Sequence, residues 1–120
     1  MCLIILAIDR HPRFPLIIAA NRDEFHNRPA QAAHLWPGAH RLIAGKDLEA
    51  GGTWLGMTQC GRFAALTNFR DPDNMGKSTQ SRGMLPLNFL QKSMTPLEYI
   101  AQIAKDNPHY NGYNLLLSDD

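Results

Sequence analysis

Residues 16–25 read Leu-Ile-Ile-Ala-Ala-Asn-Arg-Asp-Glu-Phe, an apolar run that ends abruptly in four consecutive polar side chains. The first five residues have the continuous apolar character of a buried strand. A second apolar run covers residues 2–8, and the connection between the two runs carries Pro12 and Pro15. The pattern therefore predicts a β-hairpin with two buried strands, the second of which delivers its polar residues at one end.

Cys2 opens the first apolar run, directly behind Met1. Removal of Met1 would leave one residue that carries both a thiol and a free α-amine. In N-terminal nucleophile hydrolases the amine accepts the side-chain proton, and the thiol or hydroxyl attacks an amide or ester carbonyl. The alternative is a small buried strand residue, which is a common environment for free cysteine. Position alone leaves both interpretations open.

The sequence after residue 24 predicts one long loop and then a second hairpin. Residues 25–41 contain Pro29, Pro37, Gly38 and three histidines without periodicity, which indicates a loop that serves as a functional segment or lid. Residues 53–57 and 62–69 flank Gln59-Cys60-Gly61, a turn in which Gly61 supplies the positive φ.

Two helices and a returning strand complete the chain. The apolar spacing of residues 84–90 indicates a short helix that starts near Pro86. Thr95-Pro96-Leu97-Glu98 has the composition of a capping box with proline at the first helical position. The predicted apolar face of this second helix is Leu97, Ile100, Ala101 and Ala104, and Asn107-Pro108 ends it. Residues 114–117 read as a core strand.

Several blocks of the chain closely resemble the NRDE family. They are Ala19-Ala20-Asn21-Arg22-Asp23-Glu24-Phe25 with Arg28-Pro29, Ala50-Gly51-Gly52-Thr53-Trp54-Leu55-Gly56, Leu66-Thr67-Asn68-Phe69, Ser81-Arg82-Gly83 and Tyr110-Asn111-Gly112-Tyr113-Asn114-Leu115. The resemblance implies an α+β fold, the four-layer αββα sandwich of the N-terminal-nucleophile hydrolases. The strand after residue 113 reaches its turn without a following partner, so we expect residues 1–120 to be a single NRDE-type domain truncated at its C-terminus. A naturally short chain is the alternative.

The resemblance also implies roles for residues of the polar run. Bile-salt hydrolases and penicillin V acylases, relatives by fold, end their second strand in Arg-Asn-x-Asp, whose Arg and Asp surround the catalytic cysteine. Here the order is similar but not identical, so Arg22 and Asp23 are carried over as catalytic, while Glu24 is an alternative occupant of the aspartate's place. Asn21 and Glu24 are assigned to substrate binding. A solvated surface loop is the competing interpretation.

Three further residues are candidates, the two asparagines on the same resemblance and the tryptophan on its flanking glycines. Asn68 ends a strand and would place its amide near the oxyanion, which makes it the fourth catalytic candidate after Cys2, Arg22 and Asp23. Asn114 would be a second amide contact, although asparagine at a strand entrance is often a turn residue. Trp54 lies between Gly52 and Gly56 and would wall a substrate pocket, and a core indole is its alternative.

Composition excludes several partner classes. The net charge of +1, from 12 basic and 11 acidic residues, favours neither nucleic acid nor an anionic membrane surface. No stretch is long enough to span a bilayer. The apolar start runs into Asp9-Arg10, which is unlike a signal-peptide cleavage site. Cys2 and Cys60 are therefore expected as separate reduced thiols in the cytoplasm.

Metal sites are not indicated by the sequence. The five histidines show no i, i+4 pair, and the calcium-like start Asp71-Pro72-Asp73-Asn74-Met75-Gly76 lacks the later ligands, so it is expected to be a turn.

Two functions remain. The first is a cofactor-free hydrolase in which Cys2 cleaves the carbon–nitrogen bond of a small-molecule amide. The alternative is a non-enzymatic carrier or chaperone for haem or an acylated lipid, with Cys2 or a histidine as an axial ligand of the haem. Both leave homo-oligomerisation open.

Overall fold

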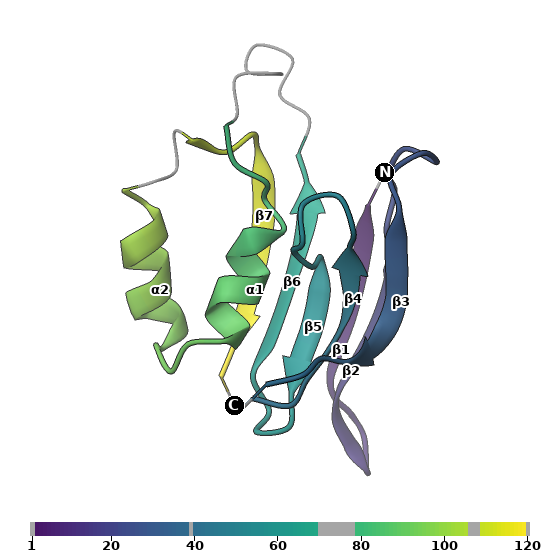
Figure 1. The fold of residues 1–120 in the computed structure, drawn as a ribbon. Coiled ribbons are helices and arrows are strands. Elements are labelled where there is room, and N and C mark those ends of the chain that lie inside the picture. The colour runs from purple at the N-terminus through teal and green to yellow at the C-terminus, as the bar shows by residue number, and fades with distance from the viewer. Residues whose placement is uncertain (1, 39, 70–78, 106–108, 120) are drawn as a thin grey trace.

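The described residues fold into two antiparallel sheets and two helices, which confirms the α+β class (Figure 1). The computed structural model describes residues 2–38, 40–69, 79–105 and 109–119, so the Asp71–Gly76 segment lies outside the described residues. The first sheet pairs β1 (Leu3–His11) with β2 (Phe14–Asn21). The second has the order β3-β4-β5-β6-β7 and comprises β3 (Ala30–Leu35), β4 (Leu42–Asp47), β5 (Leu55–Thr58), β6 (Phe63–Asn68) and β7 (Tyr113–Ser118).

The β1–β2 hairpin forms as predicted, but its expected burial is wrong. Leu3 pairs with Asn21 and Ile8 with Leu16. The apolar side chains remain on the surface, however, with Leu3 56% and Ile8 61% exposed. An apolar run indicates only that a strand is suited to burial, whereas burial itself requires a covering layer. In the described part of the chain, α1 (Met84–Leu90) packs on β5, β6 and β7 and leaves this hairpin uncovered.

The segment expected to be one long loop contains a strand. β3 pairs antiparallel with β4, with Leu35 opposite Ile43 and a register shift between Gln31 and His34. β3 was missed because its sequence, Ala-Gln-Ala-Ala-His-Leu, is poor in the β-branched and aromatic residues that mark strands. It is an edge strand that depends on backbone pairing with β4, itself absent from the sequence-based prediction.

The second predicted hairpin and the returning strand are confirmed. β5 and β6 pair through Met57 and Phe63, and Gly61 in the turn has a φ of 91°. β7 then pairs with β6 from Phe63 opposite Ser118 to Asn68 opposite Tyr113. The strand near the end of the chain therefore finds its partner in β6, within the same five-stranded sheet.

The capping box of α2 (Pro96–Ile103) forms as predicted, but the helix faces the core with a different side. The Thr95 backbone N–H donates to Glu98 at 2.9 Å, and the Glu98 backbone N–H donates to the Thr95 hydroxyl at 3.3 Å. Leu97, from the expected apolar face, is 80% exposed, while Tyr99 is buried and donates its hydroxyl to the Leu85 carbonyl at 2.7 Å. A single large anchor therefore orients this short helix, and Asn107-Pro108 lies outside the described residues.

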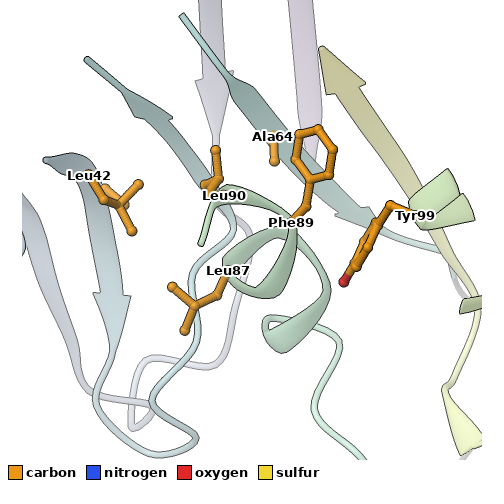
Figure 2. Close-up of a cluster of buried hydrophobic side chains, with 7 residues drawn as sticks. Leu42, Ala64, Leu87, Phe89, Leu90 and Tyr99 are labelled. Carbon is orange, nitrogen blue, oxygen red and sulfur yellow. The ribbon is translucent and has the colours of Figure 1, made fainter. Parts of the chain in front are cut away.

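The core lies between α1 and the five-stranded sheet. Figure 2 shows Phe89 of α1 beside Ala64 of β6, and Tyr99 of α2 packs on the Phe89 ring. Leu87 and Leu90 of α1 belong to the same buried cluster. Burial of aliphatic and aromatic side chains of this size stabilises a fold by roughly 1.5–3 kcal/mol each. No helix of the described residues is long and apolar enough to cross a membrane.

One charged side chain belongs to this core. The Arg62 guanidinium lies 4.1 Å from the centroid of the Phe89 ring and donates to the carbonyls of Phe89 and Met94, at 3.2 and 2.7 Å. The carbonyls at the end of a helix lack intrahelical partners, and the helix dipole favours a cation there. Arg62 therefore ties β6 to the C-terminal end of α1.

Candidate functional site

The hairpin brings Cys2 to the polar run at the end of β2. The Asp23 backbone N–H donates to the Cys2 sulfur at 3.4 Å, and the thiol donates to the Asp23 carbonyl at 3.7 Å. The adjacent Leu3 N–H donates to the Asn21 side-chain oxygen at 2.8 Å. Pairing of Leu3 with Asn21 thus places the thiol beside the chain segment that the sequence singled out. Asp23 meets the thiol through its backbone, whereas the resemblance implied a role for its carboxylate.

Arg22 is held between an aromatic ring and two carboxylates. Its guanidinium carbon lies 4.6 Å from the centroid of the Trp54 ring. Its Nη2 atom lies 4.0 Å from a carboxylate oxygen of Glu24 and 4.0 Å from one of Asp47. The cation–π contact fixes the plane of the guanidinium, and the long ion-pair distances leave it loosely paired. Glu24 also accepts the Phe25 backbone N–H at 3.0 Å.

Trp54 occupies a space that a glycine leaves open. A Cβ atom at Gly45 would lie 2.6 Å from two atoms of the Trp54 six-membered ring. The bend that carries Trp54 is tied to β4 because the Asp47 N–H donates to the Gly52 carbonyl at 2.9 Å. The indole therefore packs against β4, with the Arg22 guanidinium over its ring, and it is one of the residues that line a surface pocket.

Asp47 anchors the site, although sequence reasoning missed it. One of its carboxylate oxygens accepts from both Nε and Nη2 of Arg28, at 2.9 and 2.7 Å. The other accepts the backbone N–H of Glu49 and of Ala50. Burial raises the pKa of the Asp47 carboxyl, but the hydrogen bonds from Arg28 and the backbone outweigh this, so the pKa lies below its ordinary value. The turn formed by residues 47–50 is a sequence signal that could have found it.

Arg82 is a second residue that sequence reasoning missed. Its guanidinium donates to the Gly112 carbonyl at 2.9 Å. Burial lowers the pKa of Arg82, while the negative charge of Glu24 opposes that effect. Its signal was present in the Ser81-Arg82-Gly83 block, which matched the family pattern without an assigned role.

The two candidate amides lie on the neighbouring strands β6 and β7. Asn68 ends β6 and pairs with Tyr113, and the Asn114 amide donates to the Thr67 hydroxyl at 3.1 Å. Among residues 2–38, 40–69, 79–105 and 109–119, no contact links either amide to Cys2. Hydrogen bonds join Cys2 to Asp23 and Leu3 to Asn21, and Arg22 contacts Glu24 and Trp54. The assignment of Asn68 and Asn114 to the site stays a prediction.

A pocket of about 470 Å³ lies beside this group. Residues 22–26 and Trp54 form much of its wall, and Arg28 and residues 30–32 complete it. The lining mixes two guanidinium groups and two carboxylates with two aromatic rings. Such a wall suits a polar small molecule that the charged groups can orient. Within the described residues, no three His, Cys, Asp or Glu side chains gather in an arrangement that could hold a metal ion.

Comparison with known proteins adds family information. A sequence model of the family described as Transport and Golgi organisation 2 matches residues 1–119. The Bos taurus Transport and Golgi organization protein 2 homolog is 40% identical over 126 residues, which cover 99% of this chain and 45% of the bovine protein. The Homo sapiens homolog is 37% identical over the same length and coverage. The Drosophila melanogaster protein is 30% identical over 131 residues, covering 97% of this chain and 45% of its own. The chain thus spans less than half the length of these relatives.

Proposed function

Since this chain belongs to the Transport and Golgi organisation 2 family, we propose that it carries the nucleophile half of a cysteine hydrolase that acts on carbon–nitrogen bonds of small-molecule amides. The observation that carries the proposal is the position of the Cys2 sulfur, 3.4 Å from the backbone nitrogen of Asp23, which is one of the residues that line the charged pocket. In this proposal the two sheets are the inner layers of an αββα sandwich of the N-terminal-nucleophile type.

The chemistry requires removal of Met1. The free α-amine of Cys2 then accepts the thiol proton, and the sulfur attacks the amide carbon to form a carbon–sulfur bond. The carbonyl oxygen takes the negative charge until the carbon–nitrogen bond breaks and the leaving amine receives the proton. Water cleaves the resulting thioester, which releases the acid and restores the thiol. Arg22, stacked on Trp54, supplies positive charge near the developing oxyanion.

Two measurements test the proposal. Intact mass with 2-cyanobenzothiazole, which condenses with a 1,2-aminothiol, should show loss of Met1 and one adduct in the wild type and in Cys60→Ser. Turnover of a panel of acyl amides should disappear in Cys2→Ala and persist in Cys60→Ser, because Cys60 lies at the distant β5–β6 turn. Turnover retained in Cys2→Ala, or Met1 retained in the purified protein, would contradict the catalytic assignment.

Both cysteines are free thiols, which supports a reducing compartment such as the cytoplasm.

One observation favours the carrier function as a second candidate. The hairpin exposes large apolar side chains, among them Leu3, Ile5, Ile8 and Phe14. An exposed apolar surface of this kind binds the acyl chain of a lipid more favourably than it binds water. If the protein is a carrier, the wild type and Cys2→Ala should bind a fluorescent long-chain acyl probe equally well. Probe affinity that falls in Ile8→Lys but not in Cys2→Ala would support the carrier, and no binding at all would exclude it.

A further inference from the structure

β3 has one open edge, and the start of that edge lies in the wall of the pocket. The five-stranded sheet begins with β3, and no strand of the described chain pairs with its outer side (Figure 1). Residues 30–32 are exposed and line the same pocket as residues 22–26. An open strand edge presents backbone N–H and C=O groups that can pair with another extended chain. The pocket wall therefore includes backbone hydrogen-bonding groups as well as side chains.

Contacts of neighbouring residues show where the backbone of Ala30 points. The Leu48 N–H donates to the Pro29 carbonyl at 3.0 Å, so this carbonyl points towards the chain of β4. In a planar trans peptide the N–H lies opposite the carbonyl, so the Ala30 N–H points away from β4. Asp47, which is opposite Ala30, forms its backbone hydrogen bonds of 2.9 and 2.8 Å within residues 47–52. Ala30 and Asp47 are thus a non-hydrogen-bonded pair, and Ala30 projects both its N–H and its carbonyl from the open edge.

The open stretch of β3 is short. A register shift between Gln31 and His34 interrupts the regular pairing with β4, and such a bulge bends the strand. The Ala32 carbonyl accepts a hydrogen bond from the His34 Nδ1 atom at 2.8 Å. The bend and the bonded carbonyl both oppose pairing with a long strand, such as β3 of a second copy. The edge at Ala30 therefore suits a short extended segment better than a continuous sheet between two molecules.

The charges around the pocket do not select an anionic ligand. Its lining contains two guanidinium groups and two carboxylates. Two further carboxylates, of Asp47 and Glu49, pair with Arg28 at 2.7 and 3.3 Å. A ligand without net charge that forms hydrogen bonds through its backbone meets no such electrostatic opposition.

Phe25 adds an apolar contact surface to the same wall. Its side chain lines the pocket and is 78% exposed. Its backbone is held on both sides, because its N–H donates to the Glu24 carboxylate and its carbonyl accepts the Arg28 N–H, each at 3.0 Å. The volume of about 470 Å³ is within the range of small-molecule sites. The pocket thus offers an anchored aromatic ring beside an open strand edge.

We propose that Ala30 is the docking point for a short extended peptide, which adds to the edge of β3 as a further strand. One peptide residue donates its N–H to the Ala30 carbonyl and accepts the Ala30 N–H, as in a hydrogen-bonded pair of an antiparallel sheet. An apolar side chain of the peptide packs on Phe25. The proposal deepens the hydrolase function and rests on it for the word substrate, which becomes a peptidic amide, while docking needs only the folded chain.

The test follows the Ala30 amide by NMR while ¹⁵N-labelled protein is titrated with acetyl-Ala-Phe-Ala-amide. Cys2→Ala is the background throughout, so that turnover does not consume the peptide. We expect a saturable shift of the Ala30 amide signal and slower exchange of its proton with solvent. The analogue that is N-methylated at every residue has lost the backbone donors, and it should bind about tenfold more weakly.

Two variants at one position make the result specific. Ala30→Pro removes the N–H on the open edge without removing a hydrogen bond to β4, and it should weaken peptide binding about tenfold. Ala30→Ser keeps the N–H and is the matched control, with affinity close to that of the background. If Ala30→Pro does not fold, an ester in place of the Pro29–Ala30 amide removes the same donor and should give the same loss.

Several results would overturn the docking site. They are the absence of saturable binding at millimolar peptide, peptide-induced shifts that leave Ala30 unchanged, and equal affinity of the donor-deleted protein and Ala30→Ser. A shift of the Ala30 signal with protein concentration alone would mean that a second copy covers the edge, which also contradicts the proposal. Docking without turnover of peptides by the wild type would contradict only the hydrolase function, so the two failures are distinguishable.

Discussion

A single carboxylate oxygen of Asp47 accepts two hydrogen bonds from Arg28, at 2.9 Å from Nε and 2.7 Å from Nη2. This pair connects the segment after β2 to the end of β4, which are otherwise joined by edge-strand pairing. It also lies beneath Arg22, whose guanidinium is 4.0 Å from the same oxygen. The geometry of the candidate site therefore depends on an ion pair that need not contact a substrate.

Arg28→Ala should lower the free energy of unfolding by about 2 kcal/mol, since it removes charge-assisted hydrogen bonds from a largely buried carboxylate. Urea denaturation measures the change. Arg10→Ala, at an exposed position of β1, should stay within about 0.5 kcal/mol of the wild type. Equal losses in the two variants would show that the Asp47 contact contributes nothing specific.

Acid should weaken the fold through Asp47. Its pKa is lowered in the folded state, so the unfolded carboxyl binds protons more readily, and acid favours the unfolded state. The stabilisation is fully present above the ordinary value of about 3.9 and disappears as the pH falls through the lower folded-state value. Unfolding midpoints of wild type and Asp47→Asn, measured from about pH 6 downward, should therefore converge in acid. A constant difference would contradict the assignment.

Gly45→Ala should displace the Trp54 ring, because the new Cβ would lie 2.6 Å from two of its atoms. Overpacking of this kind costs about 1–3 kcal/mol. Trp54→Phe shortens the ring system and should relieve most of that cost. A double-mutant cycle by urea denaturation would then give a coupling of more than about 0.5 kcal/mol. Additive effects would mean that the glycine has another role.

Thr95→Ala should destabilise the protein by about 1 kcal/mol through loss of the N-cap of α2. The hydroxyl accepts the Glu98 N–H at 3.3 Å and donates to the Glu98 carboxylate at 3.0 Å. Ser93→Ala, two residues earlier and outside the capping box, serves as the control. Thermal unfolding followed by circular dichroism would distinguish them, and a neutral Thr95→Ala would show that Tyr99 alone holds the helix.

Thr58→Val should slow alkylation of Cys60 several-fold near neutral pH. The hydrogen bond between the Thr58 hydroxyl and the Cys60 sulfur, 3.1 Å long, is the largest cause of the lowered pKa of this thiol. Without it the pKa should rise and the reactive thiolate fraction should fall. Iodoacetamide kinetics in a Cys2→Ser background isolate the effect. Thr67→Val, on the same sheet, should not change the rate.

Local signals explain which parts of the fold could be predicted from the sequence. The β1–β2 and β5–β6 hairpins and the Thr95–Glu98 capping box depend on neighbours within a few residues, and all three formed. β3 depends on pairing with β4 and carries little strand signal of its own. The burial of Tyr99 in place of Leu97 depends on tertiary contact with α1, which overrides helical periodicity in so short a helix.

The residues of the candidate site show the same difference between local and long-range contacts. Cys2 and Asp23 meet through hairpin register, so the sequence could place them together. Asp47 and Arg82 arrive through loops whose partners are remote in sequence, and charge alone did not distinguish them from surface residues. Asn68 and Asn114 were placed by resemblance, and the described contacts do not join them to Cys2.

The hairpin register has a consequence for the order of folding. Pairing of Leu3 with Asn21 closes a short chain segment, and hairpins of this kind form in about 1–10 μs. Trp54 and Arg82 must instead wait for contacts that close much longer segments, which is the slower and entropically more costly step. During synthesis or refolding, the thiol should therefore meet the Asp23 backbone before Trp54 packs against Arg22. For that interval, Cys2 already lies beside Asp23 while the rest of the pocket wall is still unformed.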